Sequence, residues 1–94
     1  MRIIAVCGAG IGTSAILKVN AERALERLGI SADVSASDLA SIAAAAADAQ
    51  VILTSTELAG AVRQAIGRSF AEIVEVVNYF DVGEIGDKLE ASLG

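Results

Sequence analysis

One cysteine stands in a glycine-rich stretch near the start of the chain. Cys7 follows the short apolar run 3–6 and opens the stretch Gly8, Ala9, Gly10, Ile11, Gly12, Thr13 and Ser14. Backbone amides of such a loop, together with the positive end of a helix that follows it, attract an anion. A helix N-terminus also lowers the pKa of a cysteine thiol, which makes the sulfur a usable nucleophile. Because a thiolate and a phosphoryl group are both anions, the stretch predicts that Cys7 carries a covalent phosphoryl group.

Two better-known nucleotide motifs do not fit this stretch. A dinucleotide-binding fingerprint that began at Gly8 and Gly10 would need a third glycine where Thr13 stands. The Walker pattern needs a Gly-Lys pair before its hydroxyl residue, whereas Ser14 is preceded by Thr13. The loop therefore has no lysine to hold a triphosphate.

Three other interpretations of Cys7 remain open on the residues alone. A low-molecular-weight phosphatase or an arsenate-reductase-like enzyme also places a thiolate after the first strand, but it needs Cys-x5-Arg, and the sixth position after Cys7 is Thr13. A non-catalytic regulatory domain would use the loop only to bind an anion. A lone cysteine is also often an inert, small apolar side chain.

The elements around the loop alternate between strands and helices. We predict strands at 3–6, 32–35, 51–53 and 73–77. We predict helices at about 14–28, from Asp38 to about 46, from the residue after Glu57 to residue 66, and from the residue after Asp81 onwards. This alternation is typical of an α/β fold: a single-domain, Rossmann-like three-layer sandwich over residues 1–94. Its four-stranded parallel sheet is expected to have the order 2-1-3-4, with helices on both faces.

Helix ends are marked by capping residues. Thr54 and Glu57 have capping-box spacing, as do Asp81 and Glu84, and Asp38 is a candidate N-cap. Gly29 and Gly67 are expected to end the first and third helices. The apolar face of the first helix would carry Leu17, Ala21, Ala24 and Leu28, and that of the third helix Leu58, Val62 and Ile66. Ile85 and Leu89 would face inward from the last helix.

Loops after parallel strands meet at one edge of a sheet, where ligands bind. Cys7 should therefore share an edge with 35–38, 54–56 and 78–81. Asp81 could act there as a general acid, but its spacing to Glu84 favours a capping role. Thr13 and Ser14 are equally good candidates for N-caps of the first helix.

Composition excludes several function classes. The 94 residues carry a net charge of −5 without a basic cluster, which argues against nucleic acid and anionic lipid as partners. The weakly polar stretch 39–47 is far shorter than the roughly 20 residues that cross a bilayer. The chain has no histidine and no clustered acidic ligands, so we expect no metal and no organic cofactor. One cysteine forms no internal disulfide, which fits a reducing cytoplasm.

The run VCGAGIGTSAILKVN, residues 6–20, resembles the start of the IIB component of the bacterial sugar phosphotransferase system (PTS), in particular its ascorbate-type branch. The resemblance extends along almost the whole chain, through 53–59 and 78–89. It implies that Cys7 receives a phosphoryl group from a phosphohistidine of a IIA protein. Cys7 would then pass the group to a sugar, ascorbate-like, that is bound to a membrane IIC carrier. Amides of residues 8–14 and the hydroxyls of Thr13 and Ser14 would hold the phosphate oxygens.

This role implies brief docking with IIA and IIC around Cys7, no obligate oligomer, and a cytoplasmic protein that associates transiently with the membrane through IIC. Thr54, Ser55, Tyr79 and Phe80 are candidate partner contacts. The two hydroxyl residues are equally explained as helix caps, and the two aromatic residues as core or edge packing.

Overall fold

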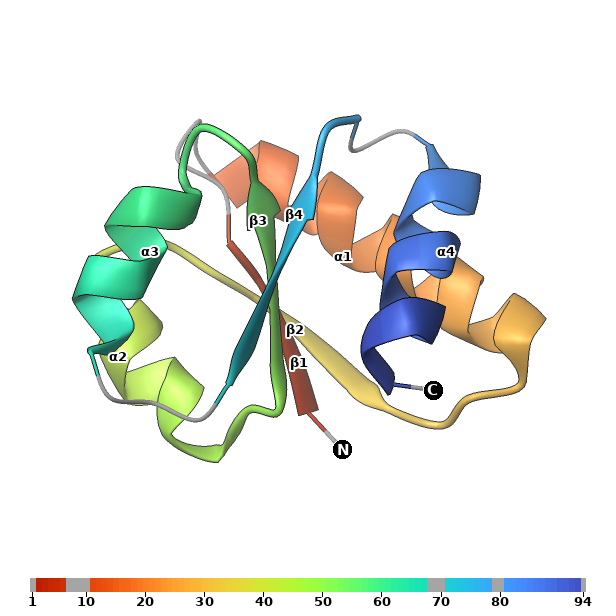
Figure 1. Cartoon of the computed structure of the whole chain (residues 1–94), viewed down its shortest axis with the longest axis horizontal. Helices are drawn as coiled ribbons and strands as arrows, with labels where there is room; N and C mark the ends of the chain where they lie inside the picture. Colours follow the sequence, from red (N-terminus) through yellow and green to blue (C-terminus); the bar gives the residue numbers. More distant parts are fainter. Residues whose placement is uncertain (1, 7–10, 68–70, 79–80, 94) are drawn as a thin grey trace.

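The four expected strands form one parallel sheet. The computed structural model describes residues 2–6, 11–67, 71–78 and 81–93, with only the backbone of 11–14 and 93. The strands are β1 (Arg2–Val6), β2 (Asp33–Ser37), β3 (Val51–Ser55) and β4 (Glu72–Val76). They lie in the order β2-β1-β3-β4, all parallel. Figure 1 shows this sheet nearly edge-on, with helices on either side of it. The predicted order 2-1-3-4 is confirmed.

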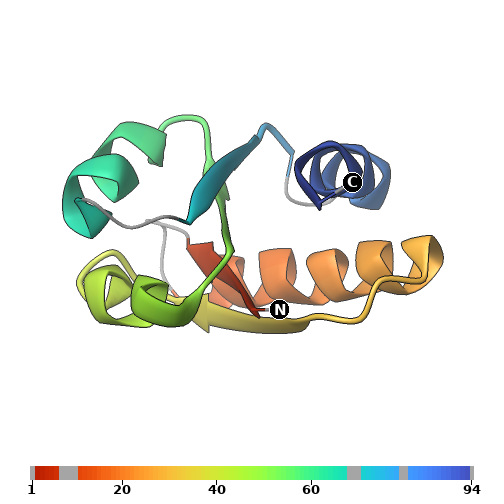
Figure 2. The same ribbon diagram turned by 60° about the horizontal axis from the view of Figure 1, so that its bottom comes forward.

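Helices cover both faces of this sheet. They are α1 (Ile11–Leu28), α2 (Ile42–Ala45), which continues into a 3-10 turn (Ala46–Asp48), α3 (Ala59–Ile66) and α4 (Val82–Leu93). α1 and α4 pack on one face and α2 and α3 on the other, which gives the expected three layers (Figure 2). None of the described helices is long and apolar enough to cross a membrane.

Strand β1 is buried on both faces, and this explains its continuous apolar run. Ile3 and Ala5 belong to the core beneath α1 and α4, whereas Ile4 and Val6 belong to the core beneath α2 and α3. Successive side chains of a strand point to opposite faces, so the two cores follow directly from this alternation. β1 is therefore a central strand with a core on each face, and its last residue, Val6, lies at the carboxyl end of the sheet.

The first helix ends where its glycine predicts. Gly29 has a φ of 70°, and the Ile30 amide donates to the Leu25 carbonyl at 3.0 Å while the Gly29 amide donates to that of Glu26 at 3.2 Å. This pair of bonds is a Schellman motif, which favours glycine because a Cβ is strained at positive φ. Gly67, with a φ of 58°, follows α3, and its amide donates to the Arg63 carbonyl at 3.2 Å.

The apolar stripes of the helices are largely as predicted. Leu17, Ala21 and Ala24 are buried in α1, and Leu25 is buried where Leu28 was expected, with Leu28 only half-buried. Ile85 and Leu89 of α4 are fully buried.

Candidate functional site

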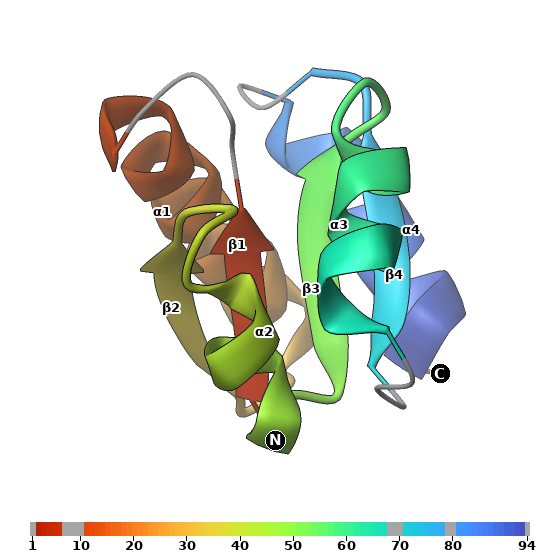
Figure 3. The ribbon, with the colours of Figure 1, turned by 90° about the vertical axis from the view of Figure 1, so that its left-hand side faces the viewer.

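The carboxyl ends of all four strands lie at one edge of the sheet. The register places Val6 beside Ser37 of β2 and beside Thr54 of β3, and Ser55 beside Val76 of β4. Figure 3 shows the last residues of β1, β3 and β4 at this common edge, which we call the carboxyl edge. The residues that the sequence assigned to one edge are thus together where they are described.

Cys7, Gly8, Ala9 and Gly10 lie outside the described residues. The remainder of the predicted phosphate loop, Ile11–Ser14, forms the first four residues of α1. The first four amides of a helix have no partner within it, and they carry the positive end of the helix dipole. α1 therefore directs these amides towards the carboxyl edge, immediately after residue 10.

The predicted start of α1 was three residues too late. Thr13 and Ser14 are not N-caps, because the helix already includes Ile11 and Gly12. Glycine costs about 1 kcal/mol in a helix interior relative to alanine, which is why the sequence placed the boundary after Gly12.

Thr54 is fully buried at the end of β3, and its hydroxyl has no hydrogen-bond partner among the described residues. Leaving a buried hydroxyl unpaired costs about 1 to 3 kcal/mol. The capping box predicted for Thr54 and Glu57 is wrong, since α3 begins after Leu58, which caps it without a side-chain bond. Ser55 instead holds the turn before the helix: its Oγ accepts a bond from the Leu58 amide at 3.1 Å. Strand β3 runs two residues longer than expected, so the turn begins one residue later than the spacing suggested.

This burial also separates the two candidate partner contacts of β3. Thr54 has no exposed surface to offer a docked protein, whereas Ser55 is half-buried. The Thr54 hydroxyl instead lies in the interior of the protein, near the carboxyl edge. Sequence spacing does not reveal such a group, because an alternating strand pattern says nothing about which polar side chain lacks a partner.

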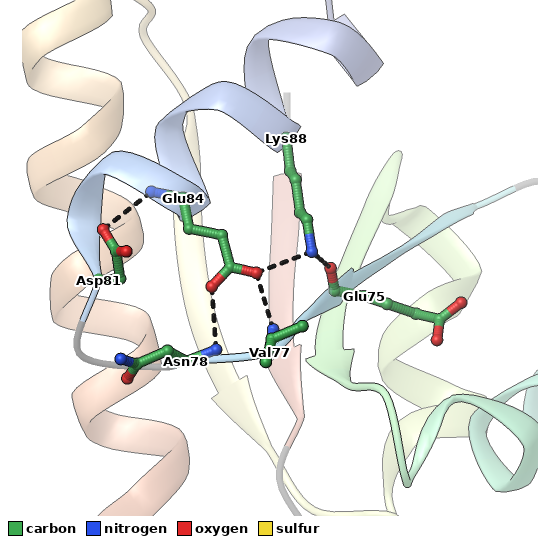
Figure 4. Close-up of polar contacts among 6 residues, drawn as sticks. All are labelled: Glu75, Val77, Asn78, Asp81, Glu84 and Lys88. Atoms are coloured by element: carbon green, nitrogen blue, oxygen red, sulfur yellow. Dashed lines mark hydrogen bonds and ion pairs between the residues drawn. The ribbon is translucent and has the colours of Figure 1, made fainter.

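Polar contacts tie the segment after β4 to α4 (Figure 4). Asp81 caps α4 as predicted: its Oδ1 accepts a bond from the Glu84 amide at 3.0 Å. The carboxylate of Glu84 accepts bonds from the amides of Val77 and Asn78, both at 2.9 Å, and contacts Lys88 Nζ at 2.8 Å. Lys88 also donates to the carbonyl of Glu75 at 2.6 Å. Tyr79 and Phe80 lie outside the described residues.

Glu84 is the residue of this edge that sequence reasoning undervalued. The capping-box spacing pointed to it, but in that motif its carboxylate would return to the amide of Asp81. That amide donates instead to the Asn78 carbonyl at 3.1 Å. Glu84 thus joins the two residues that directly follow β4 to the first turn of α4.

These contacts stabilise the charged form of Glu84. The hydrogen bond from Lys88, followed by that from the Val77 amide, lowers its pKa from 4.5 to about 2. A lowered folded-state pKa contributes stability above the ordinary pKa, and that stability is lost as the pH falls from about 4.5 towards 2.

We therefore expect Glu84→Gln to be less stable than the wild type by about 1 to 2 kcal/mol at pH 7, after allowance for solvent screening. The difference should shrink as the pH falls towards 2, because protonation removes the same charge from the wild type. Urea unfolding of both proteins at pH 7 and pH 3 measures this. Glu90→Gln, at an exposed position of α4, is the matched control and should change stability by less than about 0.5 kcal/mol at either pH. A difference in the free energy of unfolding between Glu84→Gln and the wild type that is equally large at both pH values would contradict the prediction.

No group of three or more potential metal ligands occurs among residues 2–6, 11–67, 71–78 and 81–93. The described part of the carboxyl edge instead offers backbone amides, the Thr54 and Ser55 hydroxyls, and a helix N-terminus. Such groups bind oxyanions by hydrogen bonding.

Comparison with known proteins assigns the family. The family model described as PTS system, Lactose/Cellobiose specific IIB subunit, matches residues 2–91. An ascorbate-specific PTS system EIIB component of Mycoplasma pneumoniae is 32% identical over 93 residues, covering 99% of this chain and 95% of the relative. The solved lactose-specific IIB component domain of Streptococcus pneumoniae has the same fold, with a TM-score of 0.73 at 15% identity over 99% of this chain and 94% of that one. The chain therefore belongs to the IIB family of the sugar phosphotransferase system, a family of phosphotransferases.

Proposed function

We propose that this protein, as one domain over residues 1–94, is a phosphocarrier that holds a phosphoryl group on Cys7. The observation that carries the proposal is the position of α1 in a member of the IIB family. Its N-terminal amides begin at Ile11, and the only cysteine of the chain lies in the four residues between β1 and that helix. An S-phosphoryl group at that position would be stabilised by amides from Gly8 to Ser14.

The chemistry consists of two phosphoryl transfers. In the first, the Cys7 thiolate attacks the phosphorus of a phosphohistidine on a IIA protein; the P–N bond breaks and a P–S bond forms. In the second, the hydroxyl of a sugar bound to the IIC carrier attacks the same phosphorus and releases its proton to water. The P–S bond then breaks and the thiolate is restored.

The sugar that we propose is of the ascorbate class, because the curated relative from Mycoplasma pneumoniae is ascorbate-specific and matches nearly the full length of this chain. The two partners place the protein in the cytoplasm, at the membrane only while it is docked to IIC. Docking would be weak and brief, with Ser55, Tyr79 and Phe80 as proposed contacts, and the protein would act without an obligate oligomer.

The phosphatase alternative is less well supported. It requires a guanidinium on the transition-state oxygens, and the loop 8–14 contains no arginine. Among the described arginines, Arg2 pairs with Asp48 at the opposite edge of the sheet, and Arg63 pairs with Glu75 at 3.4 Å. Amides and hydroxyls favour holding a phosphoryl group over speeding its hydrolysis.

The test is a two-stage mass measurement. The protein is incubated with a phosphorylated IIA donor, its intact mass is recorded, and membranes containing the IIC carrier and ascorbate are then added. We expect one phosphoryl group to be gained in the first stage and lost in the second. Absence of an adduct together with release of phosphate from an aryl ester would favour the hydrolase; absence of both would favour the anion-binding domain.

A further inference from the structure

Strand β4 is an edge strand, and its outer side carries backbone groups that β3 does not use. In the described part of the chain, β4 pairs with β3 alone. The Glu72 amide donates to the Gln50 carbonyl at 2.9 Å, so the even-numbered residues of β4 direct their amides and carbonyls towards β3. Those of Ile73, Glu75 and the following Val77 therefore point outwards. Outward groups of this kind are a template on which another chain can add a strand.

Three side chains of α4, spaced four residues apart, bond to β4 or to the residue after it: Glu84, Lys88 and Ser92. The Glu84 carboxylate accepts a bond from the outward Val77 amide at 2.9 Å. Lys88 Nζ donates to the outward Glu75 carbonyl at 2.6 Å, as Figure 4 shows. Ser92 Oγ donates to Glu72 Oε2 at 2.6 Å. Because residues spaced four apart share one face of a helix, α4 presents a polar stripe along the outer side of β4.

The outer side of β4 is complementary to a second copy of itself. In an antiparallel pair of two β4 strands centred on Val74, Ile73 of each copy would lie opposite Glu75 of the other. The two residues would exchange both of their outward backbone bonds, and no facing pair of side chains would join two like charges. This exchange requires the Glu75 carbonyl. Lys88 already bonds to that oxygen and places an ammonium group beside it.

The surface beside β4 leaves room for such a strand. An open hollow of about 370 Å³ lies along it, lined by residues 72–75 of β4 and by Lys88, Ala91 and Ser92 of α4. Ile73 and Glu75 are only half-buried, so neither α3 nor α4 covers this side of the strand completely. Lys88 is thus the group that both lines the hollow and occupies an outward carbonyl of β4.

We propose that the outer side of β4 is a surface on which a second copy of this chain can pair, and that Lys88, held by Glu84, prevents this pairing. Glu84 contacts Lys88 Nζ at 2.8 Å and thereby fixes the ammonium group beside the Glu75 carbonyl. Lysine is a residue with which natural proteins protect an edge strand from pairing. The ion pair keeps the protein monomeric whether or not Cys7 carries a phosphoryl group.

Lys88→Ala is expected to allow dimerisation through β4. One hydrogen bond of ordinary strength corresponds to about tenfold in an equilibrium constant, and a two-fold dimer regains two blocked carbonyls. The association constant of Lys88→Ala should therefore exceed that of the wild type about a hundredfold. Lys88→Met, which keeps the length of the side chain without its charge, should dimerise as well, whereas Lys88→Arg keeps a charged donor and should stay monomeric. Sedimentation velocity over a wide range of protein concentrations measures the mass, and circular dichroism shows that each variant is folded.

Lys18→Ala is the matched control, because Lys18 forms an ion pair of the same spacing with Glu22 on α1, at 3.2 Å, and it should stay monomeric. The double variant Lys88→Ala, Glu75→Pro lacks an outward amide that the pairing needs and should also be monomeric. Dimerisation of the wild type, of Lys18→Ala or of the double variant would overturn the proposal. Folded Lys88→Ala and Lys88→Met proteins that stay monomeric at every concentration would overturn it too. None of these results depends on phosphorylation of Cys7, so the phosphocarrier function stands or falls separately.

Discussion

Cys7→Ser is expected to abolish the phosphoryl adduct completely while leaving the fold intact. A serine hydroxyl is far less acidic than a thiol, so the N-terminal amides of α1 would face a neutral, poorly nucleophilic group in place of a thiolate. The substitution changes one atom, and residue 7 lies in none of the described strands or helices. Intact mass after incubation with phosphorylated IIA should show one phosphoryl group on the wild type and none on the variant.

A relocated thiol controls for the chemistry of cysteine itself. Ser31 is exposed just before β2, at the edge of the sheet opposite the carboxyl edge. The double variant Cys7→Ser, Ser31→Cys should remain unphosphorylated, because its thiol lies far from the N-terminus of α1. A phosphorylated double variant, or a phosphorylated Cys7→Ser, would show that the site at residue 7 is not what accepts the group.

The second large effect concerns the helix that carries the proposed phosphate site. Leu17→Ala is expected to reduce the free energy of unfolding by about 3 to 5 kcal/mol. Leu17 is fully buried between α1 and the sheet, in the same cluster as Leu53 and Ile85, so truncation leaves a cavity in the core. For a domain of this size, that loss is a large part of the total stability. Urea unfolding monitored by circular dichroism measures it.

Val19→Ala is the matched control on the same helix. Val19 is 43% exposed, and alanine is the stronger helix former. The free energy of unfolding of Val19→Ala should therefore stay within about 0.5 kcal/mol of the wild-type value. A similar loss in both variants would indicate that general helix propensity, and not burial of Leu17, holds α1 in place.

Most of the fold follows from local patterns in the sequence. Apolar runs such as 3–6 and 51–53 are too short and too β-branched for helices, and the glycines at 29 and 67 end helices whose faces repeat every three to four residues. Right-handed crossovers then leave few sheet orders open, and 2-1-3-4 is the one observed. The boundary of α1 was missed because local propensity disfavours Gly12 in a helix, whereas the helix in the structure runs through it.

The candidate site divides in the same way. The sequence by itself determined the glycine-rich stretch, the cap at Asp81 and the family resemblance, and it predicted Cys7 as the nucleophile, because these depend on residue types and short spacings. Only the tertiary structure decided that Thr54 is buried beside Val6 with no hydrogen-bond partner in the described part of the chain, and that the Glu84 carboxylate reaches back to Val77 and Asn78. Both depend on how separate segments pack together: strand register sets the first, and the angle between β4 and α4 sets the second. Neither is encoded in the spacing of residues along the chain.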